Sequence, residues 1–456
     1  MLQPAADSIA AVSPIAVALA PERKSDLWDA VLIAAIFAGM GALAYAAVAT
    51  PLLQPLLESA AREDWSRLTV RPMVIWVGMG ILLMLVRTLF WVRYRPFAAA
   101  SPEDAPSLSV VIPAYNEGAM VEQAIASVAM ALYPHERLEI IAVDDGSTDD
   151  TWTYMRRAAL RFPGRVITVR LEKNRGKRDA LAEAFRRARG EIVVTIDSDS
   201  VIEPGTLLAI AGPFRDARVG AVAGKVAVHN RRAGLIPRML HVRFVLSFDF
   251  LRSAQSIFRT VYCCPGALAA YRLSVVREVL DAWQRQTFFG VPCTYGEDRA
   301  LTNFILEKGY DSVYQRTAIV HTLVPETYRQ LCKMYLRWDR SYIREELRFG
   351  RIVWKRPPLW RALALYETTV TNLRFPVAYL SIALMILHAV QDPTAILRML
   401  LAIMVVSTVY VLYYLRSERS WEFVFGILYA YFSFFALTWI FPYAALTIRA
   451  RGWLTR

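Results

Sequence analysis

Four long apolar runs constrain the fold of this chain more than any other feature. They cover Ala30–Thr50, Met73–Val92, Phe375–Val390 and Ala395–Leu415. Each is close to the ~20 residues that a helix needs to cross the core of a bilayer. Because the runs are also nearly uncharged, we expect transmembrane helices rather than buried helices of a large soluble protein.

The charges beside these runs predict an orientation. Arg23 and Lys24 precede the first run, and Arg93 and Arg95 follow the second. Cytoplasmic flanks carry the excess of Lys and Arg, so the amino terminus and the long middle region are expected in the cytoplasm. The stretch 9–20 resembles the core of a secretion signal, but no Lys or Arg precedes it, so we predict no signal peptide.

The middle region alternates between strand and helix patterns, which is typical of a parallel, doubly wound sheet. Strands are predicted at 108–112, 138–143, 166–169 and 191–196, and helices at 119–132, 149–161 and 177–189. Ligands of such sheets bind at the carboxyl ends of the strands. Polar residues follow three of these strands: Tyr115, Asn116 and Glu117, then Asp144 and Asp145, then Asp197 and Asp199. Helix capping explains one such cluster more easily than three.

Asp197 and Asp199 stand on alternate residues directly after a strand-like run. Two carboxylates placed in this way suit a divalent cation that holds a diphosphate. A cationic loop with a glycine, residues 173–178, precedes a predicted helix and contains Lys177 and Arg178. Positive charge at a helix amino terminus suits a phosphate group, although basic loops are common. Together the two motifs predict a metal–diphosphate site.

Two further motifs each have a structural and a chemical interpretation. Glu297 and Asp298 follow a glycine at the start of an apolar helix, so they either cap the helix or provide a general base. Arg337 and Trp338 are either an interfacial pair at the membrane or a phosphate contact beside a stacking face for a sugar ring.

The remaining composition excludes other classes. The chain is 55% hydrophobic and 12% aromatic, with a net charge of +13. It lacks the basic–aromatic array of a nucleic-acid binder, so we assign the charge to anionic lipid headgroups and a nucleotide diphosphate. The four cysteines, Cys263, Cys264, Cys293 and Cys332, lie in the predicted cytoplasmic part without metal-site spacing, and we expect reduced thiols.

In this order the motifs resemble the processive, membrane-integrated family-2 glycosyltransferases, in particular class I hyaluronan synthases and rhizobial chitooligosaccharide synthases. The resembling segments are VVIPAYNEG, VDDGSTDDT, KNRGKRDAL, IDSDS, GEDRALTN and LRWDRSYIREEL, between 109 and 347. The resemblance implies an α/β, GT-A-like (doubly wound, Rossmann-like) catalytic domain on an α-helical transmembrane bundle.

The resemblance also implies roles for single residues. It assigns nucleotide binding to Tyr115, Glu117, Asp144 or Asp145, and Lys177, contact with the nucleotide sugar to Asp197, and Mn²⁺ or Mg²⁺ to Asp199. It makes Asp298 the catalytic base, and it places Arg337 at the diphosphate and Trp338 at the acceptor sugar. We add Arg178 and Glu297 as substrate-binding candidates from the motifs that contain them.

The last residues, Arg451–Arg456, resemble a gating loop over the nucleotide, which adds Trp453, Thr455 and Arg456 to the predicted substrate contacts. This role requires a cytoplasmic terminus. A single span over 421–448 would place the terminus outside, so we predict a re-entrant or interfacial hairpin broken near Ser433 or Pro442.

Three departures from the family pattern concern the acceptor and gating elements. Met334 stands where a glutamine is expected, Leu454 replaces a glycine, and the acceptor-site segment reads Cys264–Leu268. They leave the reaction type in place and make the identity of the sugar an open question.

The predicted domains are a tail at 1–25, two spans at 26–95, a catalytic domain at 101–345, an interfacial helix with two spans at 358–415, and the hairpin with the terminal motif at 416–456. Within the catalytic domain, interfacial helices are predicted near 235–260 and 326–347. The expected function is transfer from a UDP-sugar, UDP-GlcNAc with or without UDP-glucuronate, onto a β-linked polysaccharide that leaves through an inner (plasma) membrane. Expected partners are the donor, the growing acceptor and the bilayer. Alternatives are a non-processive transferase acting on a lipid phosphate and a transporter without catalysis.

Overall fold

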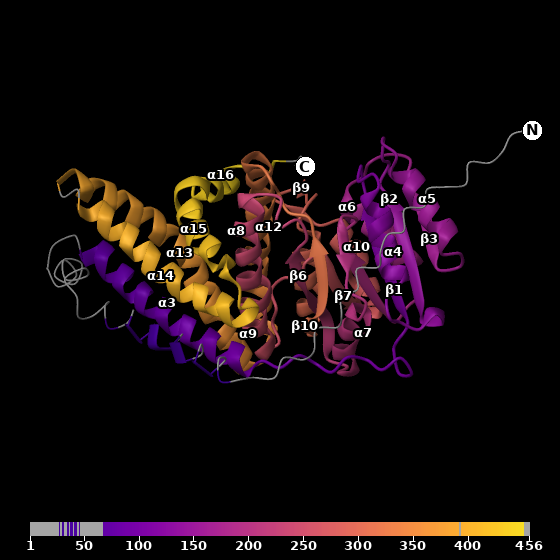
Figure 1. Ribbon diagram of the computed structural model, residues 1–456, viewed down its shortest axis with the longest axis horizontal. Coiled ribbons are helices and arrows are strands. Elements are labelled where there is room, and N and C mark those ends of the chain that lie inside the picture. Colours follow the sequence, from indigo (N-terminus) through magenta and orange to yellow (C-terminus); the bar gives the residue numbers. More distant parts are fainter. Residues whose placement is uncertain are drawn as a thin grey trace, which may run out of the picture.

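The computed structural model describes residues 67–450 except 392 and 393, and scattered positions between 27 and 45. It has two parts (Figure 1). An α/β part contains all the labelled strands. A bundle of long helices, α3, α13 and α14, lies at the opposite end of the molecule. The first predicted span, 30–50, falls largely on residues outside this description, as does the terminal motif, 451–456.

The first half of the sheet is parallel, as predicted. Its strands are β1 (Leu108–Ala114), β2 (Leu138–Asp144), β3 (Val166–Arg170) and β4 (Ile192–Ile196), joined by helices α4 (Met120–Ala129), α5 (Thr151–Arg161) and α6 (Lys177–Arg187). β1 pairs in parallel with both β2 and β4, and β2 with β3. β1 and β4 are buried on both faces, which is why they appear as continuous apolar runs in the sequence.

The second half of the sheet is mixed, so the prediction of a parallel sheet holds only for β1 to β4. The full order is β3-β2-β1-β4-β7-β6-β10-β5. β7 (Leu268–Arg272) runs antiparallel to β4 and β6 (Val219–Val228), and β5 (Ser200–Ile202) is antiparallel to β10 (Asp311–Thr322). The antiparallel strand β7 brings the segment before it, 263–267, next to the end of β4.

A layer of helices lies between the sheet and the long helices (Figure 1). It contains α8 (Leu235–Phe244), the π-helix η3 (Val245–Leu251), α9 (Arg252–Ile257) and α12 (Tyr328–Ile352). α12 begins with a capping box in which Thr327 and Gln330 satisfy each other's backbone N–H groups. The α/β part also contains α7 (Thr206–Ala211), α10 (Leu273–Gln284), the short strands β8 (Thr287–Phe288) and β9 (Val291–Pro292), and α11 (Glu297–Glu307).

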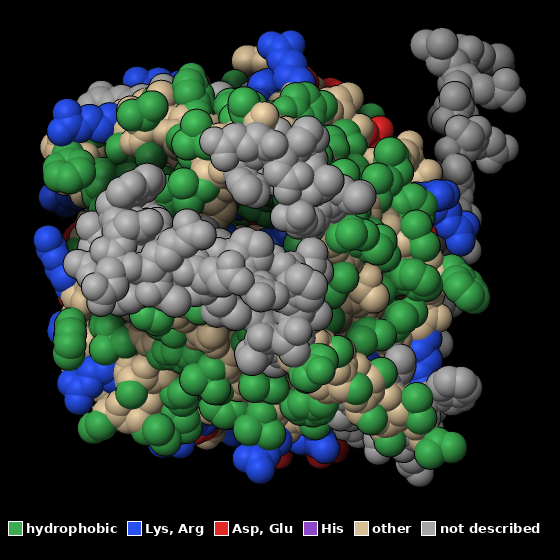
Figure 2. All heavy atoms as spheres, turned by 90° about the vertical axis from the view of Figure 1, so that its left-hand side faces the viewer, with side chains coloured by type: hydrophobic (Ala, Val, Ile, Leu, Met, Phe, Trp, Pro, Cys, Tyr) green, Lys and Arg blue, Asp and Glu red, His purple; other side chains and the backbone are tan. Residues whose placement is uncertain are grey.

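Two helices of the described chain are long and apolar enough to cross a membrane. They are Val74–Arg93 of α3 (Arg67–Arg93) and Met399–Glu418 of α14 (Thr394–Glu418). The predicted span 375–390 lies inside α13 (Pro358–Gln391). Hydrophobic side chains dominate the face formed by these helices, with Lys and Arg at its margin (Figure 2).

The predicted hairpin is broken between the two proposed positions. Trp421–Leu437 and Ile440–Leu446 meet at a 43° bend, and together they pass as a third possible span. The first helix contains α15 (Val424–Phe432) and the π-helix η6 (Ser433–Leu437), and the second is α16 (Ile440–Leu446). Whether the pair spans or re-enters stays a prediction.

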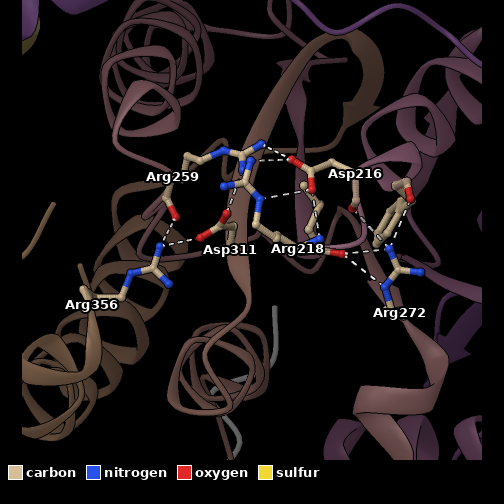
Figure 3. Close-up of polar contacts among 8 residues, drawn as sticks. Asp216, Arg218, Arg259, Arg272, Asp311 and Arg356 are labelled. Atoms are coloured by element: carbon tan, nitrogen blue, oxygen red, sulfur yellow. Dashed lines mark hydrogen bonds and ion pairs between the residues drawn. The ribbon is translucent and has the colours of Figure 1, made fainter.

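A network of arginines and aspartates joins the start of α13 to the α/β part (Figure 3). Asp311 pairs with Arg259 at 2.9 Å and with Arg356 at 2.7 Å. Asp216 pairs with Arg259 at 2.5 Å and with Arg218 at 3.1 Å. Arg356 is 3% exposed and also donates to the carbonyl oxygens of Tyr310 and Arg259, so the chain entering α13 is fixed against β10.

Candidate active site

One large cavity connects the sheet to the long helices. Its volume is about 1590 Å³. At one end it is lined by Lys177, Asp197, Asp199, Glu297 and Asp298, and at the other by residues of α13, α14 and α15. The carboxyl end of β4 and the first turn of α11 therefore open onto the same space as the membrane-facing helices.

Lys177 is the centre of the polar end. Its Nζ atom lies 2.5 Å from Asp197 Oδ1 and 3.1 Å from Glu297 Oε1. Burial disfavours the ammonium, but the charges of Asp197 and Glu297 outweigh burial and raise the pKa of Lys177 above its ordinary value. The lysine is thus a fixed cation where the sequence predicts an anionic phosphate.

Asp298 has the geometry of a general base. Its Oδ1 accepts from the backbone N–H of Arg299 at 2.7 Å, and its Oδ2 accepts from that of Gly266 at 3.1 Å. These bonds hold the carboxylate at the cavity wall. Burial raises the pKa of Asp298, and the neighbouring charge of Glu297 raises it further. A carboxylate with a raised pKa is a better proton acceptor near neutral pH.

Glu297 differs from Asp298 in its ion-pair partner and in the direction of its pKa shift. Burial opposes its charged form, but Lys177 holds the pKa of Glu297 below its ordinary value. Both acids lie in the first turn of α11, where the helix dipole favours negative charge. The helix-capping interpretation and the general-base interpretation of this motif are therefore compatible with each other.

Two glycines allow the close packing around these acids. Gly296 has φ +75°, and a Cβ there would lie 1.8 Å from Ser341 Oγ on α12. A Cβ at Gly266 would lie 2.9 Å from Lys177 Nζ. The segment that departs from the family pattern, Cys264–Leu268, thus supplies a backbone donor to Asp298 and space for Lys177.

Asp199 lies beside the Lys177 cluster and is a candidate metal ligand. Its Oδ1 accepts from Ser200 Oγ at 3.1 Å and from Thr322 Oγ1 at 3.3 Å. Over the described part of the chain, no three His, Cys, Asp or Glu side chains converge in a way that could hold a metal ion. Asp199 as a single carboxylate fits a cation whose other ligands come from a phosphate-bearing substrate. It does not fit a site that the protein makes alone.

Arg337 and Trp338 reach the cavity from α12. Arg337 is close enough to Glu297, Asp197 and Asp298 to be stabilised by their charges, although burial lowers its pKa. Trp338 is 42% exposed, and its ring lies 6.2 Å from Phe244 and 5.6 Å from Tyr335. Phe244, Tyr335 and Trp338 thus form an aromatic patch on the cavity wall.

Five predicted site residues do not line this cavity. Asp145 accepts from the backbone N–H groups of Arg175 and Gly176, both at 2.8 Å, so it holds the basic loop in place. Asp144 is fully buried and lies 3.2 Å from Arg170 Nε. Tyr115 and Glu117 are partly exposed beside the end of β1.

Arg178 is the fifth of these residues, and it points into the core. Its guanidinium donates to Trp283 O and Gln286 Oε1, and it lies 5.1 Å from the Trp283 ring centroid. These contacts give it a structural role.

The predicted terminal contacts, Trp453, Thr455 and Arg456, lie outside the described residues. The segment just before them approaches the site, because the Tyr295 hydroxyl donates to Ala450 O at 3.0 Å. Gly266 was predicted only as part of the acceptor-site segment Cys264–Leu268, and Thr322 was not predicted. The pairing of β7 and β10 into the sheet brings both to the end of β4, and no local pattern signals the position of Thr322.

Comparison with known proteins identifies a sequence family. Residues 109–280 match Glycosyl transferase family 2. An N-acetylglucosaminyltransferase of Azorhizobium caulinodans is 31% identical over 352 residues, which cover 77% of this chain and 87% of the relative. A hyaluronan synthase of Streptococcus pyogenes is 31% identical over 373 residues, which cover 80% of this chain and 86% of the relative.

A solved structure has the same fold. A mannosyltransferase from Pyrobaculum calidifontis, in complex with GDP-Man and Mn²⁺, superposes with a TM-score of 0.57 at 23% identity. The match covers 80% of this chain and 99% of that one. At this identity the likeness establishes the GT-A-like fold alone.

Proposed function

Because the chain belongs to glycosyl transferase family 2 and is a glycosyltransferase, we propose that it is a processive, inverting polysaccharide synthase that uses a UDP-sugar. UDP-GlcNAc is the proposed donor, with UDP-glucuronate as a possible second one. The names of the two groups of relatives support this choice. The observation that carries the proposal is the single cavity that joins the Lys177–Asp298 cluster to the membrane-facing helices.

The polar end of the cavity suits the transfer step. Asp298 would accept the proton of the acceptor hydroxyl while the oxygen of that hydroxyl attacks the anomeric carbon of the donor. Lys177 and Arg337 would stabilise the negative charge of the departing diphosphate. Asp197 orients Lys177 through the bond at 2.5 Å and lies at the same cavity wall, where it would contact the donor sugar.

Asp199 would hold Mn²⁺ or Mg²⁺ together with the donor. A divalent cation supplies charge neutralisation of the diphosphate in such a site. Asp199 lines the cavity and accepts a hydrogen bond from Thr322, and this single protein carboxylate supports a cation that arrives with the donor. Tyr115, Glu117, Asp144 and Asp145 would belong to the nucleotide-binding end, and Trp453, Thr455 and Arg456 to a loop that closes over it.

The far end of the cavity would accept the product. Trp338 would stack against the acceptor sugar, and the chain would then pass between α13, α14 and α15. We propose a multi-pass protein of the inner (plasma) membrane with the catalytic domain, 101–345, in the cytoplasm. The basic flanks Arg93 and Arg95 support this orientation.

The test is UDP release by the purified protein in detergent with Mn²⁺, with UDP-GlcNAc, UDP-glucuronate and UDP-glucose supplied singly and in pairs. We expect UDP release together with a growing polymer, and a loss of at least ~100-fold in Asp298→Asn, the size expected for removal of a general base. UDP release that yields a single-sugar lipid product would favour the non-processive alternative. Unchanged turnover in Asp298→Asn would contradict the catalytic role of Asp298.

A further inference from the structure

The carboxylate of Asp298 is held by the next residue in the chain, Arg299. The backbone N–H of Arg299 donates to Asp298 Oδ1 at 2.7 Å. The guanidinium of Arg299 lines the same cavity, and it is close enough to Cys263 for its charge to act on that thiol. Cys263 Sγ in turn lies 3.7 Å from Asp298 Oδ2. The position and the charge of Arg299 therefore both affect the carboxylate of Asp298.

The side chain of Arg299 is fixed by α12. Its Nη2 atom donates to Glu346 in an ion pair whose side chains are only 14% and 12% exposed. Its guanidinium also lies 4.6 Å from the centroid of the Tyr342 ring. Burial opposes the charge of Arg299, but Glu346 outweighs burial and raises the pKa of Arg299 above its ordinary value. The positive charge of Arg299 is thus compensated by α12.

Glu346 is itself held by α13. The Nδ2 atom of Asn372 donates to Glu346 Oε2 at 3.1 Å and to Thr368 O, within α13, at 2.8 Å. The Oδ1 atom of Asn372 accepts from the Tyr342 hydroxyl at 2.7 Å. Asn372 thus uses both ends of its amide to orient the two α12 side chains that contact Arg299.

We propose that Asn372 and Glu346 are positioning residues for the general base, because they fix Arg299 and thereby the carboxylate of Asp298. This inference rests on the proposed function, which makes Asp298 the base. Glu346 keeps the guanidinium of Arg299 paired, so that its charge does not stabilise the anionic form of Asp298. An aspartate whose anion is less stabilised is the better proton acceptor.

The place of Asn372 separates positioning from substrate binding. Among the described residues of this chain of contacts, Arg299, Tyr342 and Glu346 line the cavity, whereas Asn372 does not. A substitution of Asn372 therefore leaves in place the side chains that face the substrates. A change in turnover would have to pass through Glu346 and Arg299.

Other charged and titratable groups also face Asp298. They are Glu297 of α11, Lys177 of α6, Arg252 of α9, Cys263 and Cys264 before β7, Tyr271 of β7 and Arg337 of α12. All of them stay unchanged in the variants of Glu346 and Asn372. A shift in the pH profile of those variants therefore reports on the pairing of Arg299.

The experiment compares the wild type with Glu346→Gln, Asn372→Leu and Asn372→Gln. Glu278→Gln is the matched control for loss of a carboxylate, because Glu278 pairs with Lys308 at the surface. Ser381→Ala is the matched control on α13, because its hydroxyl donates to a carbonyl oxygen of its own helix. UDP release is measured in detergent with Mn²⁺ and UDP-GlcNAc, with and without UDP-glucuronate, across the acidic pH range.

We expect kcat to fall by ~10-fold or more in Glu346→Gln and Asn372→Leu, because the base is displaced from its productive position. KM for the donor should stay within about twofold, because the donor contacts remain. In Glu346→Gln the unpaired guanidinium stabilises the anion of Asp298, so the acidic limb of kcat moves to lower pH. Asn372→Gln keeps an amide donor and should recover part of the loss, and both controls should match the wild type.

A double-mutant cycle with Arg299→Met tests whether Glu346 acts through Arg299. Arg299→Met keeps the backbone N–H that binds Asp298 and removes the charge that Glu346 pairs. In this background Glu346→Gln should lower kcat by less than ~3-fold, because the residue through which it acts is absent.

Losses of kcat that multiply in this cycle would overturn the inference, since Glu346 would then act without Arg299. An acidic limb at the wild-type pH in Glu346→Gln, together with a lowered melting temperature, would also overturn it and leave a structural contact alone. In both cases the proposed function stands if the wild type releases UDP and Asp298→Asn does not. Full turnover in Asp298→Asn, or no UDP release by the wild type, would refute the proposed function itself.

Discussion

At the scale of single residues, two adjacent acids of one helix turn take opposite properties from their surroundings. Lys177 holds the pKa of Glu297 low, whereas burial and then the charge of Glu297 raise the pKa of Asp298. The pair therefore contains one permanent anion and one group able to exchange a proton. This division matches an enzyme that must keep a cation in place and accept a proton at the same site.

The raised pKa of Asp298 predicts the pH dependence of turnover. As pH falls, Asp298 takes up a proton at a higher pH than an ordinary aspartate, whose pKa is ~3.9, and the base is then lost. We expect the acidic limb of kcat against pH to lie above that value. The measurement is UDP release at saturating donor across the acidic range.

Asp298→Asn provides the control for this pH profile. The activity that remains in this variant should not show the acidic limb, because the titrating carboxylate is absent. An acidic limb at the position of an ordinary aspartate, or the same limb in Asp298→Asn, would show that another group controls the profile.

At the scale of elements, the contact between α11 and α12 fixes the helix of the proposed base, Asp298, against the helix of the proposed acceptor residue, Trp338. Gly296 begins α11, and Ser341 lies under it on α12, one helix with Arg337 and Trp338. Arg344 of α12 also donates to Tyr295 O at 2.5 Å, and Asn303 of α11 donates to Glu345 Oε2 at 3.1 Å. These hydrogen bonds therefore join the two helices.

Replacing Gly296 by Ala should disturb this contact. The residue has φ +75°, and the added methyl group would lie 1.8 Å from Ser341 Oγ. We expect a loss of ~2 kcal/mol or more in the free energy of unfolding, from overpacking and a left-handed backbone together. Thermal unfolding in detergent measures it, alongside UDP release.

Gly350 is a matched control in α12, because a Cβ there meets nothing within 4 Å. Gly350→Ala should be neutral or raise stability by up to ~1 kcal/mol through helix propensity. Equal melting temperatures for Gly296→Ala and wild type would contradict the close packing.

Trp338→Ala tests the acceptor face of α12. The exposed ring offers a sugar a flat apolar surface, and its loss should remove about 1 kcal/mol or more of acceptor binding. We expect elongation to fall more than hydrolysis of the donor, because the nucleotide end of the cavity is unchanged. Polymer length and UDP release are measured in the same reaction, and equal losses in both would count against stacking.

The elements that could be predicted from sequence are those defined by local pattern. β1 to β4 and the helices between them follow from apolar runs and caps, and the acids at the ends of β2 and β4 follow from the general position of ligands in such sheets. The contacts of Gly266 with Asp298 and of Thr322 with Asp199 could not be predicted, because long-range pairing of β7 and β10 brings these residues to the site. The inward position of Arg178 could not be predicted, because a helix start gives no sign of which side chain turns inward; its guanidinium lies 5.1 Å from the centroid of the Trp283 ring.

At the scale of the whole molecule, the product path requires a fixed relation between the α/β part and the long helices. The network of Figure 3 provides one such connection, since Arg356 stands directly before α13. Arg356 is a strong anchor at this point because it is buried and donates to three acceptors, whereas the neighbouring Lys355 pairs with Glu307 at the surface. The cavity that runs from Lys177 to α13 depends on this alignment.

Arg356 and Arg218 allow that connection to be tested with one pair of variants. Arg356 is 3% exposed and pairs with Asp311, whereas the side chain of Arg218 is 73% exposed and pairs with Asp216. Arg356→Ala leaves Asp311 with only Arg259 and removes the three hydrogen bonds that Arg356 donates, so we expect a loss of ~3 kcal/mol or more in unfolding free energy. Arg218→Ala should lose less than ~1 kcal/mol, the range of surface ion pairs.

The measurement is thermal unfolding of both variants in detergent, with product length measured below the unfolding transition. If the network aligns the two parts, Arg356→Ala shortens the polymer even at temperatures where the protein remains folded. Equal melting temperatures for the two variants would mean that α13 is held to the catalytic domain by its other contacts, such as those of Glu367 and Asn372, and not by the arginine network.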